Sequence, residues 1–310
     1  MDRYNGIAPM IKETGMTSHD VINRLRRISG QKKIGHTGTL DPLASGLLLI
    51  CFGRATKLTQ FLTDWDKTYR AEITLGSVSD TLDKGGLISE SGSVPDLSNV
   101  DLEKVMDQFR GKVMQKVPAY SAVKVGGQEL YKYARKGIEV ETPSREIEIT
   151  SLKIISYVSP ILKIDASCSK GTYIRTLADD IGQAIGCGAY LSGLVRTSLG
   201  PYELESAATL TAFADLQEAD KLNGLIRPIE NVLSFPTINV RRPAAETIIN
   251  GGNLRTCDIV SRSGDFDMND LISIADESGR IKAIGKATCT SSELAPENND
   301  SFFSYVRVLS

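Results

Sequence analysis

The chain has 310 residues, of which 41% are hydrophobic and 24% are charged, and its formal net charge is −2. This length predicts one large domain with one small domain, and the ordinary globular composition excludes a largely disordered protein. The near-balanced charge excludes a protein that coats nucleic acid indiscriminately, because phosphate binding requires clustered Lys and Arg side chains.

Membrane, targeting and metal-ligand patterns give no positive signal. The longest apolar run, residues 47–52, is far shorter than the roughly 20 residues that a membrane-spanning helix needs, and the first residues (MDRYNG) lack the layout of a signal peptide. We therefore expect a cytoplasmic protein without membrane contact. Two histidines and no Cys-x-x-Cys pair predict no zinc site and no disulfide framework, but buried free thiols at Cys51, Cys168, Cys187, Cys257 and Cys289.

The first elements are read from hydrophobic periodicity. Thr17 or Ser18 can cap a helix whose apolar face recurs through residues 21–28. A Gly-rich loop at residues 35–46 follows, and then residues 47–52 form an apolar run typical of an interior strand that is covered on both faces. Alternation from Tyr69 onward predicts a half-buried strand that begins at or near this tyrosine, with its first residue at the sheet edge.

The later elements favour an α+β fold. Residues 102–109 have helical spacing, residues 162–168 alternate as a strand, and a helix that ends at Gly186 places Tyr173 and Arg175 in its first turn. Strands and helices do not alternate as βαβ units, which predicts a mixed, largely antiparallel sheet flanked by helices. After two prolines near residues 228–236, a tail of short strands predicts a small, mostly β domain over residues 237–310.

A basic segment precedes the predicted strand at residues 162–168. Between residues 110 and 137 the one acidic residue is Glu129, against seven basic residues: Arg110, Lys112, Lys116, Lys124, Lys132, Arg135 and Lys136. Charge alone leaves two interpretations open, a phosphate-binding surface and a solvated charged face.

Residues 35–58 are the most informative stretch and read GHTGTLDPLASGLLLICFGRATKL. Asp41 lies in the Gly-rich loop directly before Pro42, which favours an extended backbone and presents the carboxylate rigidly. Without further information an Asp-Pro pair here is either a turn or a nucleophile. The loop is not a phosphate-binding P-loop, because no Gly-Lys-Ser or Gly-Lys-Thr closes it.

This stretch resembles the catalytic motif of the TruB-type tRNA pseudouridine-55 synthases, and further segments match in the same order. They are KTYRAEITLG (67–76), CSKGTYIRTLADDIG (168–182) and GCGAYLSGLVRTSLG (186–200), while VPAYSAVKVGGQELYKYARKGIEVE (117–141) resembles the RNA-clasping insertion of that family. The tail, including DLISIADESGRIKAIGKA, resembles a PUA-like domain. The resemblance implies a pseudouridine synthase domain at 1–232 with an insertion at about 110–140, and a PUA-like RNA-binding domain at 237–310.

The resemblance implies a reaction, a substrate and roles for single residues. It implies isomerisation of uridine to pseudouridine at position 55 in the T loop, without cofactor or metal, after the base has been flipped out. The partner is tRNA, contacted at the T arm and elbow, and no obligatory protein partner is implied. The implied catalytic residues are Asp41, Tyr69, which stacks on the base and assists proton transfer, and Arg175, which pairs with Asp41; the implied substrate contacts are His36, Lys57, Tyr173 and Leu194.

Two rival functions and one departure from the family pattern remain. An RNA-binding folding factor that remodels tRNA would tolerate replacement of Asp41, whereas the isomerase would not. A guide-dependent synthase inside a ribonucleoprotein would normally carry extra segments, for which we see no room. The family usually has Asp-Lys-Pro near the amino terminus, whereas this chain reads Ile11-Lys12-Glu13. The packing around the active-site loop is therefore the feature that this change affects.

Overall fold

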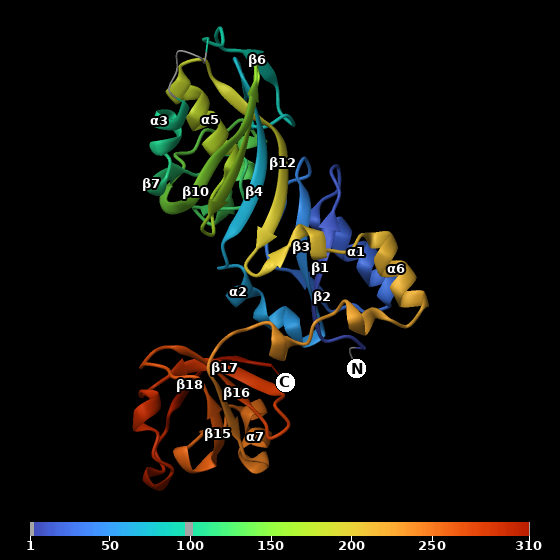
Figure 1. The fold of residues 1–310 in the computed structure, drawn as a ribbon, viewed down its shortest axis with the longest axis vertical. Helices are drawn as coiled ribbons and strands as arrows, with labels where there is room; N and C mark the ends of the chain where they lie inside the picture. Colours follow the sequence, from blue (N-terminus) through green and yellow to red (C-terminus); the bar gives the residue numbers. More distant parts are fainter. Residues whose placement is uncertain (1–2, 97–101, 310) are drawn as a thin grey trace.

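A computed structural model describes residues 3–96 and 102–309, and half of the strands in these residues join one large sheet (Figure 1). Within these residues the sheet has nine strands, with the order β1-β3-β12-β4-β11-β10-β7, while β2 pairs with β3 and β13 with β12. The pair β12 and β3 is parallel and the other pairs are antiparallel, which confirms the predicted mixed, largely antiparallel sheet. The strands are β1 (Gly6–Lys12), β2 (Ile34–His36), β3 (Ser45–Phe52), β4 (Lys67–Leu75), β7 (Gly111–Lys116), β10 (Ser144–Val158), β11 (Ile161–Cys168), β12 (Ala189–Leu199) and β13 (Tyr202–Glu203).

Strand β3 is buried on both faces, as its apolar run predicts. Leu48 and Ile50 pack in one core with helices α1 (Ser18–Ser29) and α6 (Leu210–Glu218), and Leu47 and Leu49 pack in another on the opposite side. Helix α1 begins after Thr17, whose side chain forms a capping box with Asp20. Gly46 has a φ of 106°, and a Cβ atom there would lie 2.3 Å from the Arg196 carbonyl oxygen, so the crossing of β3 and β12 requires glycine.

Strand β4 begins two residues before Tyr69 and lies in the interior of the sheet, so the expected edge position is wrong. Tyr69 pairs with Ala166 on β11 and with Arg196 on β12. The hydrophobic alternation did not predict the start of β4 at Lys67, because a lysine occupies a core position there. Its ammonium group donates to the Thr63 and Trp65 carbonyls, and burial lowers the pKa of Lys67 to about 8.

Helices cover the sheet around β4 and β12. Helix α5 (Ile174–Ile185) ends at Gly186, which has the left-handed conformation predicted for a C-terminal cap. It packs with α3 (Leu102–Asp107) over the apolar side chains of β4 and β11. Short elements elsewhere in the catalytic part are α2 (Thr59–Leu62), β5 (Ser77–Ser79) and β6 (Ile88–Glu90).

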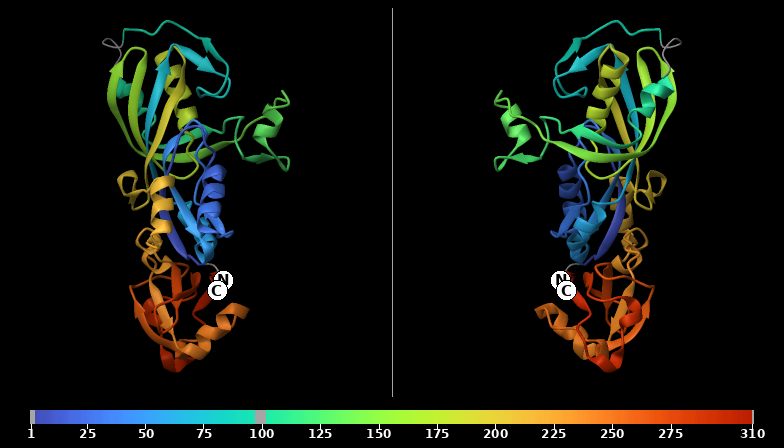
Figure 2. Two further views of the ribbon diagram at one scale, coloured as in Figure 1. Left: turned by 90° about the vertical axis from the view of Figure 1, so that its right-hand side faces the viewer. Right: turned by 90° about the vertical axis from the view of Figure 1, so that its left-hand side faces the viewer.

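A segment between β7 and β10 projects from the body of the molecule, as the two turned views make clear (Figure 2). It contains β8 (Lys124–Val125), β9 (Gln128–Glu129) and α4 (Leu130–Ala134). Residues 111–116 of the predicted insertion belong instead to the large sheet as β7. We use "insertion" below for residues 117–143.

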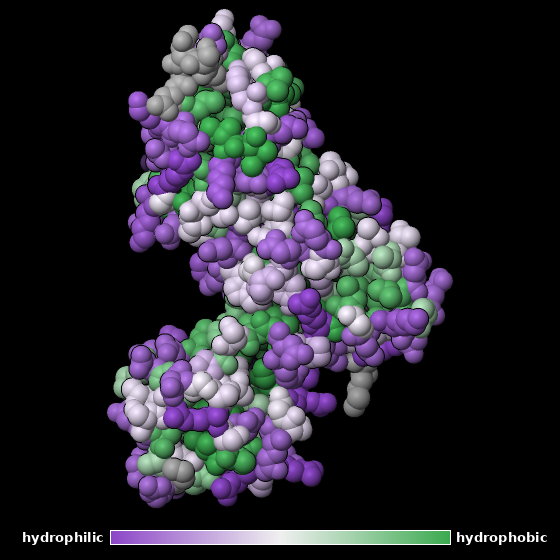
Figure 3. All heavy atoms as spheres, viewed as in Figure 1, coloured by the Kyte–Doolittle hydropathy of each residue, from purple (hydrophilic) through white to green (hydrophobic). Residues whose placement is uncertain are grey.

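The C-terminal part forms a second sheet with the order β15-β14-β16-β17-β18. Its elements are β14 (Thr237–Val240), α7 (Arg242–Thr247), β15 (Ile259–Ser263), β16 (Leu271–Ala275), β17 (Ile281–Ala287) and β18 (Phe303–Val308). Ile281, Ile284 and Leu309 share one hydrophobic cluster with Leu58 and Leu62 of the catalytic part. Figure 3 shows hydrophobic side chains where the two parts meet. This apolar contact fixes the small domain against the large one.

The cysteine expectation is correct for three of five residues. Cys51, Cys168 and Cys187 are buried, whereas Cys257 and Cys289 are half-buried. Cys257 lies in a surface turn of the small domain, where its thiol donates to the Asn299 side-chain oxygen at 3.0 Å. Within residues 3–96 and 102–309, no helix combines the length and apolar character needed to cross a membrane.

Candidate active site

One cavity of about 240 Å³ collects five of the seven site residues expected from the sequence. Its wall is built by the Gly-rich loop, β4, β12, the start of α5 and the insertion. The expected residues on it are Asp41, Tyr69, Tyr173, Arg175 and Leu194, and Tyr120 of the insertion joins them.

Arg175 lies between two carboxylates. Its Nη1 atom is 3.7 Å from Oδ2 of Asp41 and 3.7 Å from Oδ2 of Asp83. The side chains of Arg175 and Asp83 are each 8% exposed, whereas that of Asp41 is 41% exposed. Asp83 therefore balances the buried guanidinium, and Asp41 is the carboxylate that a ligand in the cavity can reach.

Sequence reasoning missed Asp83. Its Oδ1 atom accepts hydrogen bonds from the Thr81 hydroxyl and from the Gly85 backbone N–H, both at 2.8 Å, so the carboxylate is held in one orientation. The signal in the sequence is a second aspartate in a Gly-containing turn, Asp80 to Gly86, directly after β5. That pattern alone is also typical of an ordinary turn.

Lys12 ties the amino-terminal strand to the loop that carries Asp41. Its ammonium group is fully buried and donates to the backbone carbonyls of Glu13, Met16 and Ala44 at 3.0, 2.6 and 2.6 Å. Ser18 adds two hydrogen bonds to the backbone of Leu40. The clamp uses the carbonyl of Glu13 and not its side chain, so the altered flanking sequence leaves it intact.

Replacing Lys12 by methionine is expected to lower the free energy of unfolding by about 3 kcal/mol, because buried carbonyl oxygens lose their donor. Urea denaturation measures this loss. Lys153→Met, at an exposed position on β10, is the control and should change stability by less than about 0.5 kcal/mol. Equal stability of the two variants would contradict the clamp.

Tyr69 is 9% exposed and contacts Arg196, a second residue that sequence reasoning did not single out. Burial raises the pKa of the Tyr69 phenol, while the charge and hydrogen bond of Arg196 act in the opposite direction. The buried Arg196 guanidinium also donates to the carbonyls of Leu47 and Gly38 at 2.7 and 3.2 Å. A raised pKa keeps the hydroxyl protonated near neutral pH, which favours ring stacking over a role as base.

His36 lies outside the cavity. It was expected in the Gly-rich loop, but it belongs to a strand. It ends strand β2, where Gly35 and His36 pair with Cys51 and Ile50 of β3. Burial lowers the pKa of the imidazole, and the nearby charge of Arg196 lowers it further. The ring is therefore neutral at physiological pH, and its buried Nδ1 atom has no hydrogen-bond partner.

Lys57 lies at the junction with the C-terminal part, away from the cavity. It belongs to the 3-10 helix Gly53–Leu58 that follows β3. Partial burial and the charges of Lys33, Arg307 and Arg54 lower its pKa. Arg307 comes from β18 and donates to the Gln60 side chain at 3.0 Å. Both parts of the chain thus contribute to one cationic group, which we call the junction cluster: Lys33, Arg54, Lys57 and Arg307.

Three of the seven basic residues of the 110–137 segment pair with carboxylates. Arg110 pairs with Glu103 and Asp107, and Lys112 and Lys132 also form ion pairs with carboxylates. Arg135 instead stacks over the Tyr131 ring at 5.4 Å and lines a cavity of about 390 Å³ that shares Asp41 and Arg175 with the first. Arg135 of the insertion therefore lies beside the candidate active site.

Comparisons with known proteins agree over nearly the whole chain. Residues 26–174 match the N-terminal domain of TruB family pseudouridylate synthases, residues 175–234 the C-terminal domain of tRNA pseudouridylate synthase B, and residues 236–299 the PUA domain. A protein of Caldanaerobacter subterraneus subsp. tengcongensis named tRNA pseudouridine synthase B is 42% identical, over 91% of this chain and 95% of its own length. One of the same name from Bacillus pumilus is 42% identical, over 90% of this chain and 92% of its own length.

Solved structures show the same overall fold. A chain in an H/ACA RNP bound to a substrate RNA containing 2′-deoxyuridine is 25% identical, with a TM-score of 0.74 over 98% of this chain and 85% of its own length. A chain in an archaeal box H/ACA Nop10-Cbf5 complex is 26% identical, with a TM-score of 0.74 over 99% of this chain and 86% of its own length. The chain belongs to the TruB family of pseudouridylate synthases.

Proposed function

We propose that this protein isomerises uridine to pseudouridine at position 55 in the T loop of tRNA, without a cofactor. The observation that carries the proposal is a solvent-reachable carboxylate, Asp41, fixed beside the buried guanidinium of Arg175 in a cavity of about 240 Å³. Relatives named tRNA pseudouridine synthase B support tRNA as the substrate. The test is incubation with unmodified tRNA followed by mapping of pseudouridine.

The reaction breaks the C1′–N1 bond, turns the uracil and joins C5 to C1′, while C5 loses a proton and N1 gains one. Asp41 attacks either the sugar or the base, and the guanidinium of Arg175, 3.7 Å away, holds the attacking carboxylate at the wall of the cavity. Tyr69 stacks on the uracil, which is worth about 1–3 kcal/mol per stacked base. Tyr173 and Leu194 line the rest of the space in which the ring turns.

Access to the cavity requires that the uridine leaves the stack of the T loop. Flipping a base costs a few kcal/mol, which contacts elsewhere on the RNA must offset. We assign His36 to the space that the base vacates, because its neutral imidazole, whose Nδ1 atom has no hydrogen-bond partner, directly precedes the loop that carries Asp41 and lies outside the cavity. We assign residues 1–232 to the catalytic domain and 237–310 to RNA binding.

The junction cluster provides phosphate contacts outside the active site. Its cations come from both parts of the chain, and clustered cations are the feature that binds a phosphate backbone. We propose that it contacts the tRNA beyond the T loop, toward the elbow, and that the protein works on free tRNA without an obligatory protein partner.

Replacing Lys57 by alanine is expected to weaken tRNA binding several-fold at low salt and to reduce the slope of log K against log salt by about 1, because one phosphate contact is lost. The single-turnover rate at saturating protein should stay unchanged. Filter binding across a salt series measures the slope, with the exposed Lys221→Ala as control. An unchanged slope would contradict the proposal that Lys57 contacts a phosphate of the RNA.

A further inference from the structure

The carboxamide of Gln115 forms two hydrogen bonds with one backbone residue beside the active site. Its Nε2 atom donates to the Tyr173 carbonyl at 3.0 Å, and its Oε1 atom accepts from the Tyr173 N–H at 2.8 Å. Gln115 is 3% exposed and is the second-last residue of β7, directly before the insertion. Tyr173 is the N-cap residue of α5 and has no side-chain cap, so Gln115 satisfies the backbone there.

The side chain of Tyr173 is held by the same group of residues. Arg145, the partner of Gln115 across strands β7 and β10, places its guanidinium 4.9 Å from the ring centroid, and Arg175 places its own at 5.5 Å. Gly171 allows this approach, because it has a φ of 84° and a Cβ atom there would lie 2.6 Å from Nη1 of Arg145. Backbone and ring of Tyr173 are therefore both fixed from the base of the insertion.

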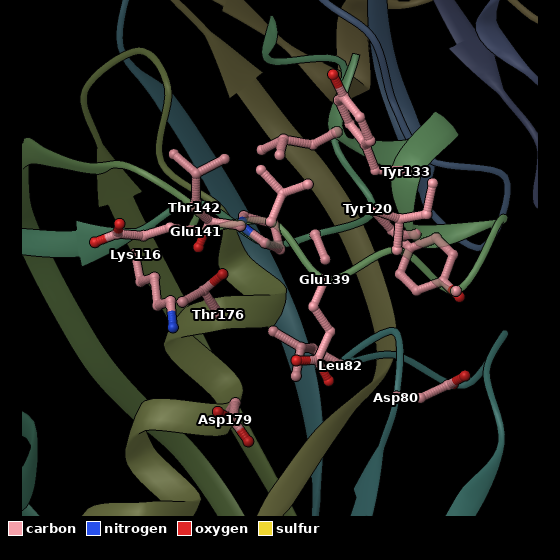
Figure 4. A pocket seen from close by; sticks show the side chains of 18 of the residues that line it. Asp80, Leu82, Lys116, Tyr120, Tyr133, Glu139, Glu141, Thr142, Thr176 and Asp179 are labelled. Atoms are coloured by element: carbon pink, nitrogen blue, oxygen red, sulfur yellow. The ribbon is translucent and has the colours of Figure 1, made fainter. Parts of the chain in front are cut away.

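The insertion also binds Arg175 itself. The Nη2 atom of Arg175 donates to the Tyr120 carbonyl at 2.8 Å. Beyond this point a cavity of about 730 Å³ separates the insertion from α5, with Tyr133 and Glu139 on one side and Thr176 and Asp179 on the other (Figure 4). The base of the insertion thus contacts the start of α5, whereas its outer part is separated from the helix by this cavity.

We propose that Gln115 is a positioning residue that couples the insertion to the catalytic arginine, an inference that rests on the proposed function. It holds the N-terminus of α5 so that Arg175 faces Asp41, while Tyr120 fixes the far side of the same guanidinium. Gln115 has no contact with the substrate in this account and acts through Tyr173 and Arg175.

Replacing Gln115 by leucine removes both hydrogen bonds at nearly constant volume. We expect the single-turnover rate of pseudouridine formation to fall by about tenfold to a hundredfold, because small displacements of a catalytic group have effects of this size. The tRNA dissociation constant should stay within about threefold, since phosphate contacts determine it. Gln108→Leu is the matched control, because that amide makes one long, exposed hydrogen bond to Lys104.

The isosteric Gln115→Glu variant adds a second measurement, the pH dependence of the rate, which would not change if Gln115 had only a structural role. The protonated carboxyl group accepts from the Tyr173 N–H and donates to its carbonyl, as the amide does, whereas the ionised group has no proton to donate. Burial raises the pKa of this carboxyl group and the cross-strand Arg145 guanidinium lowers it, and the rate relative to wild type should fall as pH rises through that pKa between about 5.5 and 8.5. A ratio that does not change with pH would overturn the proposal.

Hydrogen exchange of the Tyr173 amide, measured without RNA, separates this proposal from the proposed function. Faster exchange in Gln115→Leu than in wild type is expected, and equal protection would contradict the role of the two Gln115 hydrogen bonds in holding the Tyr173 backbone. A leucine variant that keeps the wild-type rate within about twofold would overturn the coupling to catalysis. A wild-type protein that forms no pseudouridine would overturn the proposed function instead.

Discussion

Replacing Asp41 by asparagine is expected to abolish pseudouridine formation while tRNA binding is retained. The amide has nearly the same shape but lacks the anionic oxygen that attacks the nucleotide, so the single-turnover rate should fall by at least about a thousandfold. Binding should stay within a few-fold of wild type, because Asp41 contributes no phosphate contact. Single-turnover assays with the protein in excess over labelled tRNA measure the two quantities separately.

The control for this experiment is Asp66→Asn, which removes an exposed carboxylate that does not line the cavity. The Asp41→Asn protein also separates the isomerase from an RNA folding factor. Folding of tRNA should survive the substitution if the protein remodels RNA as well, whereas isomerisation should not. Turnover at the wild-type rate in Asp41→Asn would refute the assigned nucleophile.

Replacing Arg175 is expected to have the second largest effect. Lysine keeps the positive charge but has no planar fork that contacts Asp41, Asp83 and the Tyr120 carbonyl together, so we expect Arg175→Lys to lower the single-turnover rate by about a hundredfold. Methionine also removes the charge and leaves the buried Asp83 carboxylate without a cationic partner. Arg175→Met should therefore lower the free energy of unfolding by about 3 kcal/mol as well as the rate.

A double variant tests the origin of that instability. Adding Asp83→Asn to Arg175→Met removes the uncompensated buried charge, so stability should recover in large part while the rate stays low. Urea denaturation and single-turnover kinetics on wild type, Arg175→Met, Asp83→Asn and the double variant complete the cycle. A double variant that is no more stable than Arg175→Met would contradict the view that Asp83 balances the arginine.

Elements with strong local periodicity were predictable from the sequence. The capped helix α1, the two-sided burial of β3 and the Gly186 end of α5 each follow from neighbouring residues and agree with the structure. The resemblance placed Asp41, Tyr69, Tyr173, Arg175 and Leu194 at one site, and all five line one cavity. Local patterns and motifs are thus sufficient to predict most of the fold and the centre of the candidate site.

Features that depend on distant contacts were not predictable. Lys67 reads as a polar residue before a strand, although it is buried within β4. Asp83 and Arg196 acquire their roles from partners far along the chain, namely Arg175 and Tyr69. Gln115 is an ordinary strand residue until the fold brings Tyr173 beside it. Single-sequence patterns do not report such pairings.

Mapping every pseudouridine formed in an unmodified tRNA transcript tests the central claim most directly. The wild-type protein, without added cofactor or partner, should convert the T-loop uridine at position 55 to near completion and leave the other uridines unchanged. Conversion at a different uridine, or no conversion at all, would contradict the account of this cavity as the site that isomerises a flipped T-loop base.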